Sequence, residues 1–207
     1  MKLTNESFDL RKSNTNELLV HLIKIISNKD FINNKNPNNE IPFYICPFLP
    51  EFTLEVNEVI TFLKKQLNKR EIEVLEIDIY DISIEILKKR NIFEKIKNKE
   101  SQIKKILLKD TLRNVLNSEK HLVPFIRRLI SEKQYNVLFI KGIGEVFPYI
   151  RTHNLLSNLQ KVLKNEPTII FFPGSYRNDP KMGSSLNLFC EFYNDNYYRA
   201  FNILTMR

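Results

Sequence analysis

Two short apolar runs constrain the fold of this chain more than any other feature. Residues 137–140 read Val-Leu-Phe-Ile and residues 168–172 read Thr-Ile-Ile-Phe-Phe. A strand whose successive side chains are all apolar has both faces buried, which is typical of a parallel sheet covered by helices on both sides. The sequence therefore predicts a three-layer α/β fold with a mostly parallel sheet and helices on both faces.

The rest of the chain supplies helices and strands in alternation with these runs. Further strands are expected over about 41–46, 71–80 and 200–204. Helices are expected over about 14–28, 53–68 and 148–163, the last starting at Pro148, with two or three more over about 82–133. A chain of 207 residues matches one domain in size. We therefore expect a single domain over residues 1–207, with an N-terminal helix (about 14–28), a basic helical insert (about 82–133) and a flexible loop at 174–185.

This order of elements resembles the skeleton of the P-loop NTPases, but the phosphate-binding chemistry is missing. A P-loop needs G-x-x-x-x-G-K-[ST], whose backbone N–H groups and lysine hold the phosphates. After the first expected strand, residues 47–52 read Pro-Phe-Leu-Pro-Glu-Phe, with neither glycine nor lysine. Lys141 stands near the position of the metal-binding acid, and only Glu145 in the following loop could replace that acid. We expect a P-loop-NTPase-like topology without a P-loop, and no nucleotide hydrolysis.

No other catalytic or metal-binding pattern is complete. Gly142-x-Gly144 is a fragment of a dinucleotide-binding fingerprint and favours a tight turn. Three histidines lack metal-ligand spacing and have no cysteine nearby: His21, His121 and His153. Cys46 and Cys190 stand among apolar or aromatic residues and are expected to be reduced core thiols. We expect no enzyme activity, no cofactor and no metal.

The positive charge of the chain is concentrated in one segment. Residues 86–133, the basic segment, hold 14 Lys and Arg against 5 Asp and Glu, whereas the remainder holds 18 against 19. Such a segment can contact several phosphates, although it has no groove-reading motif and like-charged helix faces are often only solvated. The candidate contacts to nucleic acid or an acidic partner are Lys88, Lys89, Arg90, Lys104, Lys105, Lys109, Arg113, Arg127 and Arg128.

A second group of candidates lies where strands of the expected sheet meet the following loops. Residues 151–154 read Arg-Thr-His-Asn at the start of the last expected helix, and residues 195–199 read Asp-Asn-Tyr-Tyr-Arg before the last strand. Tyr and Arg are enriched at binding hot spots, but the same residues also close turns and cover sheet edges, so both alternatives stay open. The candidate partner-binding residues are Glu145, Arg151, His153, Asn154, Tyr176, Tyr197, Tyr198 and Arg199.

Six motifs give the chain a resemblance to the BrxB family of BREX (bacteriophage exclusion) gene clusters. They are Asn-Glu-Ile-Pro-Phe-Tyr at 39–44, Ile-Asp-Ile-Tyr at 77–80, the Gly-x-Gly-Glu-Val-Phe-Pro-Tyr-Ile-Arg-x-His-Asn segment within 142–160, 167–174 with Tyr176, 183–189, and 195–201. The resemblance covers about residue 30 to the C-terminus. It departs at 97–122 and at 177–182, which looks like a short insertion.

The resemblance implies a component of phage defence without an assigned reaction. It implies a non-catalytic adaptor that binds a PglZ-type BREX protein, with a BrxC-type ATPase and a PglX-type methyltransferase as further partners. The alternative is a nonspecific DNA-binding module that uses the basic segment, with weak affinity for DNA. The sequence itself has no apolar signal core at its start and no apolar run near the ~20 residues of a membrane span. We therefore expect a cytoplasmic protein with no membrane contact.

Overall fold

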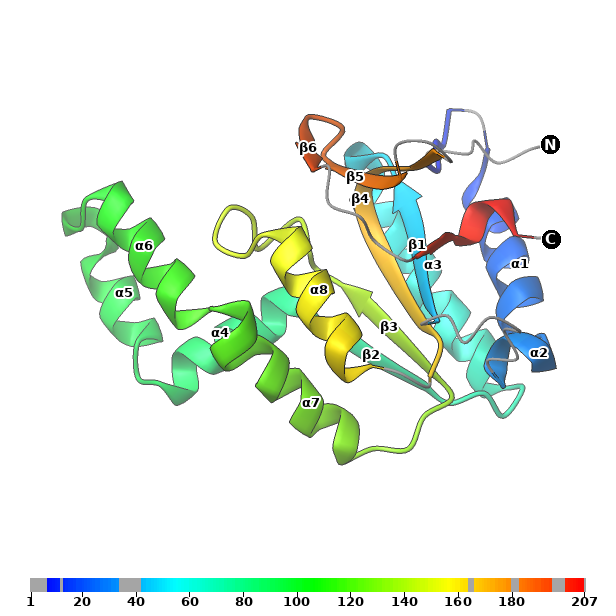
Figure 1. The fold of residues 1–207 in the computed structure, drawn as a ribbon, viewed down its shortest axis with the longest axis horizontal. Coiled ribbons are helices and arrows are strands. Elements are labelled where there is room, and N and C mark those ends of the chain that lie inside the picture. Colours follow the sequence, from blue (N-terminus) through cyan, green and yellow to red (C-terminus); the bar gives the residue numbers. More distant parts are fainter. Residues whose placement is uncertain are drawn as a thin grey trace.

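The chain folds around one sheet with helices on both faces (Figure 1). The computed structural model describes residues 7–11, 13–33, 42–163, 166–179, 183–194 and 200–206. The strands are β1 (Phe43–Phe48), β2 (Val74–Asp78), β3 (Val137–Lys141), β4 (Thr168–Asp179), β5 (Gly183–Leu188), β6 (Phe192–Asn194) and β7 (Phe201–Asn202). The main path runs β2-β3-β4-β1-β7 and every pair along it is parallel. The predicted α/β fold with a mostly parallel sheet is confirmed.

The helices form two layers around this sheet, plus a projecting pair. They are α1 (Thr15–Ile26), α2 (Lys29–Ile32), α3 (Thr53–Asn68), α4 (Ile79–Lys89), α5 (Phe93–Lys99), α6 (Lys105–Val115), α7 (Val123–Ser131) and α8 (Thr152–Val162). One core cluster joins the sheet to α1 and α3, and the other joins it to α4, α7 and α8. Figure 1 shows α5 and α6 reaching away from the sheet at the end of the molecule.

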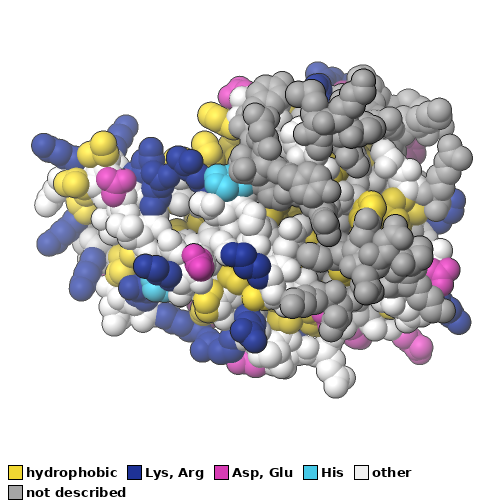
Figure 2. Space-filling model, in the orientation of Figure 1, with side chains coloured by type: hydrophobic (Ala, Val, Ile, Leu, Met, Phe, Trp, Pro, Cys, Tyr) yellow, Lys and Arg dark blue, Asp and Glu magenta, His cyan; other side chains and the backbone are white. Residues whose placement is uncertain are grey.

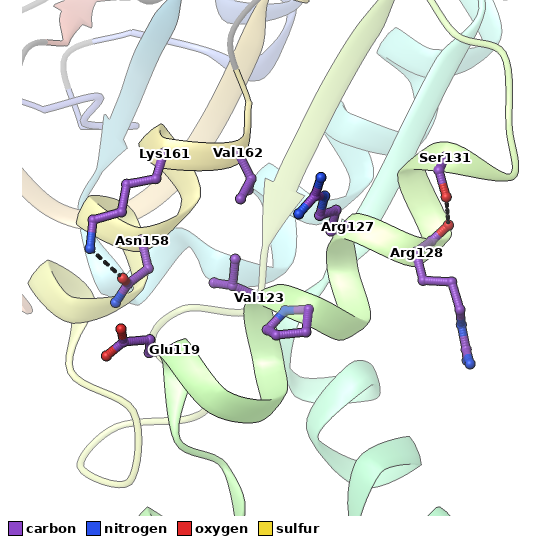
Figure 3. Close-up of a pocket in the computed structure, with 9 residues that line it drawn as sticks. Glu119, Val123, Arg127, Arg128, Ser131, Asn158, Lys161 and Val162 are labelled. Atoms are coloured by element: carbon purple, nitrogen blue, oxygen red, sulfur yellow. Dashed lines mark hydrogen bonds between the residues drawn. The ribbon is translucent and has the colours of Figure 1, made fainter.

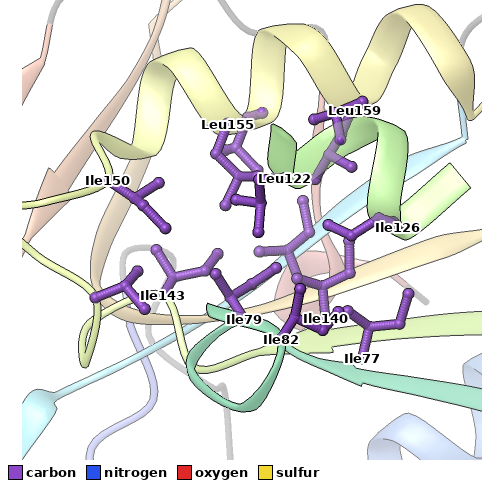
Figure 4. Packing of buried hydrophobic residues seen from close by; sticks show 14 of the residues in the cluster. Ile77, Ile79, Ile82, Leu122, Ile126, Ile140, Ile143, Ile150, Leu155 and Leu159 are labelled. Carbon is purple, nitrogen blue, oxygen red and sulfur yellow. The ribbon is translucent and has the colours of Figure 1, made fainter. Parts of the chain in front are cut away.

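Alternate residues of each central strand feed the two cores. In β3, Leu138 and Ile140 belong to the core under α8, whereas Val137 and Phe139 belong to the core under α3. Figure 4 shows the first of these cores, where Ile140 packs with isoleucines and leucines of α4, α7 and α8. All four residues are fully buried. Because both faces exclude water, the strand must be apolar throughout, which is the pattern seen in the sequence.

Several boundaries differ from the expected ones. The strand expected over 71–80 is β2 at Val74–Asp78, and the strand expected over 200–204 is the two-residue β7, followed by a 3-10 turn at Ile203–Thr205. β1 continues through Pro47 to Phe48. Pro47 lies beyond the end of β7, where the missing N–H of proline removes no hydrogen bond between strands. The Pro47 carbonyl there accepts a hydrogen bond from Phe8 N (2.7 Å). The last long helix does not start at Pro148: α8 begins at Thr152, with Arg151 in the extended N-cap position. Residues 143–150 form turns between β3 and α8.

The expected flexible loop at 174–185 is replaced by a β-hairpin in the described residues. β4 runs on to Asp179 and pairs antiparallel with β5, which pairs in turn with β6. Gly174 permits this continuation, because a Cβ there would collide with the Asn187 carbonyl of β5. Tyr176 lies buried in the hairpin and donates a hydrogen bond to the Ala200 carbonyl (2.6 Å). Because most residues of 174–185 are polar, the sequence there does not show the alternation of apolar and polar residues that predicts a strand.

Candidate functional site

The turn after β1, where a P-loop would lie, is closed by the chain itself. Leu49 N donates to the Phe8 carbonyl (3.0 Å), and the Thr53 hydroxyl donates to the Pro50 carbonyl (2.6 Å). Arg11 pairs with the buried Asp9 within the N-terminal segment (2.9 Å) and also lies 3.8 Å from Glu51 of the turn. The Leu49 and Phe52 N–H groups of this turn therefore have partners within the chain, and Pro47 and Pro50 offer no N–H to a phosphate.

Lys141 takes part in a network of charges at the ends of β2 and β3. Its ammonium lies 2.9 Å from Glu76 and 3.7 Å from Asp78, while Lys64 of α3 lies 3.3 Å from Glu76. Burial alone would raise the pKa of Glu76, but the hydrogen bond and charge of Lys141, helped by Lys64, outweigh it and lower that pKa. Asp78 also caps α4 by accepting from Tyr80 N (2.9 Å). Lys141 thus has a structural role.

A basic pocket of about 370 Å³ lies on the other side of the sheet, at the start of α8. Lys109 and Arg113 of α6 line it together with Arg151 and His153. The sequence placed the first two among nucleic-acid contacts and the last two among partner contacts. The fold brings them together because the helical insert passes over the edge where the chain leaves β3 and enters α8.

Apolar and aromatic side chains form the rest of this pocket. Phe172 of β4 and two leucines of β5 are buried beneath it, and Phe147, Pro148 and Phe192 complete the wall. The Phe147 and Phe192 rings lie 4.8 Å apart between centroids, and Phe192 is exposed. The lining therefore offers aromatic rings as well as cations.

The start of α8 contributes polar groups to the basic pocket. No side chain caps the helix at Arg151, and the positive end of the helix dipole lies there. Thr152, the first helical residue, is only 7% exposed, and its Oγ1 has no hydrogen-bond partner. Burial lowers the pKa of His153, and the neighbouring Arg151 charge lowers it further. Among the groups described, the site gathers positive charge and an unused hydroxyl.

The remaining partner-binding candidates are dispersed. Glu145 and Asn154 are exposed, Glu145 in the turn after β3 and Asn154 in the first turn of α8. Tyr176 is buried, so its side chain is not part of the surface in this structure. Tyr197, Tyr198 and Arg199 lie outside the described residues. Among the described members of the predicted partner-binding set, Arg151 and His153 are thus the two that share the pocket.

A second basic hollow, of about 560 Å³, lies between α7 and α8 (Figure 3). Arg127 and Arg128 line it from α7, and Lys161 lines it from α8, where it donates to Asn158 Oδ1 (2.9 Å). Figure 3 shows the Arg128 guanidinium directed away from α8. Arg128 instead lies over the Phe125 ring (5.3 Å) and near Glu132 (3.7 Å). This hollow is less enclosed by aromatic groups than the basic pocket.

The other basic candidates are on exposed parts of the insert. Lys88 and Lys89 lie over the rings of Phe93 and Phe125, at 5.4 and 4.5 Å from the centroids, and Lys89 also pairs with Glu85 (2.7 Å). Lys89, Arg90 and Arg128 line a third hollow, of about 310 Å³, beside Phe125. Two further candidates, Lys104 and Lys105, are exposed without a feature of this kind.

The α5–α6 arm (residues 93–115) exposes apolar side chains among its basic ones. Ile106 is 67% exposed and Leu107 is 57% exposed, and only Val115 of α6 is buried. Figure 2 shows hydrophobic side chains among Lys and Arg at this end of the molecule. The apolar residues of this segment have the spacing of an amphipathic helix, which would favour Ile106 and Leu107 facing inward. The structure has no core beneath them because α6 lies beyond the sheet.

Within the described ranges, no three His, Cys, Asp or Glu side chains come together as metal ligands would. In that part of the chain, none of the helices has the length and apolar character of a membrane span. Cys46 is buried, as predicted, and burial raises its pKa to about 12. The prediction for Cys190 is wrong, because it lies exposed in the turn between β5 and β6.

Sequence reasoning missed Thr152 and Phe192 as parts of the basic pocket. Thr152 was concealed because Pro148 was taken as the helix start, which placed Thr152 within the first turns rather than at the N-terminus. Phe192 was missed because the β4–β6 hairpin was not expected. The run Leu186-Asn187-Leu188, which alternates apolar and polar residues, was the available signal for a strand there.

Comparison with known proteins gives a consistent answer. The family model described as BREX protein BrxB matches residues 75–203. The chain is 33% identical to the BREX protein BrxB of Bacillus cereus over 191 residues, covering 91% of this chain and 97% of the relative. It is 29% identical to the BREX protein BrxB of Escherichia coli over 179 residues, 86% of each chain. No solved structure matches the chain, so the P-loop-like character of its topology stays a prediction. The chain belongs to the BrxB family, components of BREX phage defence.

Proposed function

We propose that this protein is a non-catalytic adaptor of a BREX defence complex and that it binds a PglZ-type BREX protein. The observation that carries the proposal is the α5–α6 arm, which exposes Ile106 and Leu107 beside lysines. Exposed apolar groups clustered with charged ones mark protein interaction sites more often than scattered single residues do. Membership of the BrxB family supports a partner within the BREX system.

Surface charge favours an acidic partner surface on the arm. Lys104 and Lys105 precede Ile106, and Lys109 follows one turn later, so the apolar pair is bordered by cations. A complementary surface would pair acidic residues around an apolar centre. The BrxC-type ATPase and the PglX-type methyltransferase are further candidate partners within the same complex.

The proposal is tested by co-purification with the PglZ-type protein of the same gene cluster, followed by titration of the two pure proteins. Ile106→Asp with Leu107→Asp should reduce the affinity about 30-fold or more, the loss expected of a hot spot of about 2 kcal/mol. The matched control is Leu54→Asp, because Leu54 is 77% exposed on α3, away from the arm. The control should bind like the unmodified protein.

Two results would count against this assignment. Equal loss in the arm and control variants would show that the added charge, not the surface, matters. A loss of partner affinity in Arg151→Ala but not in the arm variants would place the interface at the start of α8, where other partner-binding candidates were predicted from the sequence. Melting temperatures of all variants separate loss of binding from loss of folding, since these side chains are exposed and should contribute little stability.

DNA binding is the second candidate function, and the hollow between α7 and α8 favours it. Arg127, Arg128 and Lys161 line this hollow. Such groups contact phosphates without reading sequence. The expected binding is weak and decreases with salt, because contacts to phosphates release counterions.

A further inference from the structure

The basic pocket at the start of α8 has two chemically different walls. Arg113 and Lys109 of α6 and Arg151 before α8 form a cationic wall. Phe147 and Phe192 form the aromatic wall, above a buried apolar floor. A volume of about 370 Å³ falls within the range of about 300–1,000 Å³ that small-molecule sites occupy.

The cations of this pocket have no acidic partners among the described residues. Among the described residues, the ion pairs lie elsewhere, at Asp9, Glu51, Glu76, Asp78, Glu85 and Glu132. Lys109, Arg113 and Arg151 take part in none of them. The α8 dipole adds positive potential at the same place, where Thr152 holds a buried hydroxyl without a partner.

We propose that this pocket binds a nucleotide, with its phosphate between Arg113, Arg151 and the start of α8 and its base against Phe192 and Phe147. Guanidinium groups bind phosphate through paired N–H donors, and a monoester phosphate carries close to two negative charges. Aromatic side chains stack on nucleobases of any sequence, each base contributing about 1–3 kcal/mol. The ligand is therefore a phosphorylated nucleoside or the nucleotide unit of a single strand.

An acidic protein segment fits this pocket less well. A carboxylate brings one charge to a site with three unpaired cations, and an acidic peptide has no flat ring to place on Phe192. A nucleotide uses both walls at once, because its phosphate and base are joined by a sugar. The pocket is also distinct from the turn after β1, where the Leu49 N–H donates to the Phe8 carbonyl of the N-terminal segment. Binding at the start of α8 thus requires no hydrolysis.

The test is isothermal titration of the full-length protein with AMP, adenosine and inorganic phosphate. AMP should bind, with adenosine and phosphate each at least about tenfold weaker, since each uses only one wall. Arg113→Gln and Arg151→Gln should each weaken AMP about tenfold or more, and Phe192→Ala should weaken AMP but leave phosphate unchanged. Arg70→Gln is the matched control, because Arg70 is an exposed arginine just after α3 that lines neither the basic pocket nor the hollow between α7 and α8.

Two probes distinguish the source of the nucleotide. A 5′-phosphorylated oligothymidylate that binds no better than TMP points to a free nucleotide, and one that binds at least about tenfold better points to a single strand. The proposal is overturned if AMP shows no binding at about 5 mM, if phosphate binds as well as AMP, or if Arg70→Gln weakens AMP as much as Arg113→Gln. An oligoglutamate peptide that binds as tightly as AMP, and loses affinity in Arg151→Gln, would assign the pocket to an acidic protein segment instead.

Discussion

Replacing Glu76 by glutamine tests whether the charges at the ends of β2 and β3 hold the fold together. Glu76 and Lys141 side chains are each 22% exposed and lie 2.9 Å apart. Exposed pairs contribute about 0.2–1 kcal/mol, whereas breaking a fully buried pair costs about 3–5 kcal/mol. For this partly buried pair we expect a loss of about 1–2 kcal/mol. For a domain of this size, that loss lowers the melting temperature by roughly 3–6 °C.

The matched control is Glu85→Gln. Glu85 also pairs with a lysine, at 2.7 Å, but its side chain is 48% exposed and its partner lies on the same helix. Such a pair stabilises a helix by about 0.3–0.5 kcal/mol, so this variant should melt within about 2 °C of the unmodified protein. Chemical denaturation measured at constant ionic strength gives both free energies of unfolding.

The pH dependence provides the sharper result. The pKa of Glu76 is lowered in the folded protein from its ordinary value of 4.5. Its contribution to stability is therefore fully present above about pH 4.5 and is lost as the pH falls through the lower folded value. The stability difference between the unmodified protein and Glu76→Gln should be constant near neutral pH and shrink below about pH 4.5. A difference that is absent at pH 7, or that grows on acidification, would refute this account of the pair.

Three further predictions follow from individual positions. Gly142→Ala should destabilise the fold by about 2 kcal/mol or more in urea denaturation, because Gly142 has φ +78° and an added Cβ would collide with Asp78. An unchanged free energy of unfolding would refute the close contact between Gly142 and Asp78. A thiol reagent should modify Cys190 quickly in the native protein and Cys46 only after denaturation, because Cys46 is buried and its pKa is raised to about 12; mass spectrometry identifies the site. DNA binding by the basic segment (86–133) should weaken with salt, with a log–log slope near −0.9 per phosphate contacted, and selective binding that persists at about 0.2 M salt would contradict it.

The main architecture was predictable because a strand buried on both faces has a continuous run of apolar residues in the sequence. The continuous apolar runs of β3 and β4 gave the parallel sheet, and Asn14 and Asp78 now explain where α1 and α4 begin. The apolar pattern of α3 does not decide every position. Leu54 could belong to the inner face by its apolar character, but it is exposed, and Val56 is buried on that face. A helix with apolar residues on more than one side does not reveal which side is covered.

The candidate site was predictable only in part, because its residues come from segments far apart in the sequence. Arg151 and His153 were found from their position after a strand, where parallel sheets place their sites. Lys109 and Arg113 were found from charge alone. Nothing local in the sequence shows that α6 passes above the start of α8, since this depends on how the insert between β2 and β3 returns to the sheet.

Helix α6 connects the two proposed surfaces, and this decides how variants in it should be used. Residues 106, 109 and 113 share one face of the helix, because positions three, four and seven apart lie close together around an α-helix. That face therefore runs from Ile106 on the exposed arm to Arg113 in the basic pocket. A change at 109 or 113 affects the nucleotide proposal and the adaptor proposal together. Leu107 lies about 100° away from Ile106 around the helix, so Leu107→Asp alters the arm while leaving this face unchanged. A loss of partner affinity in Leu107→Asp with unchanged AMP binding would assign the arm to the partner independently of the pocket.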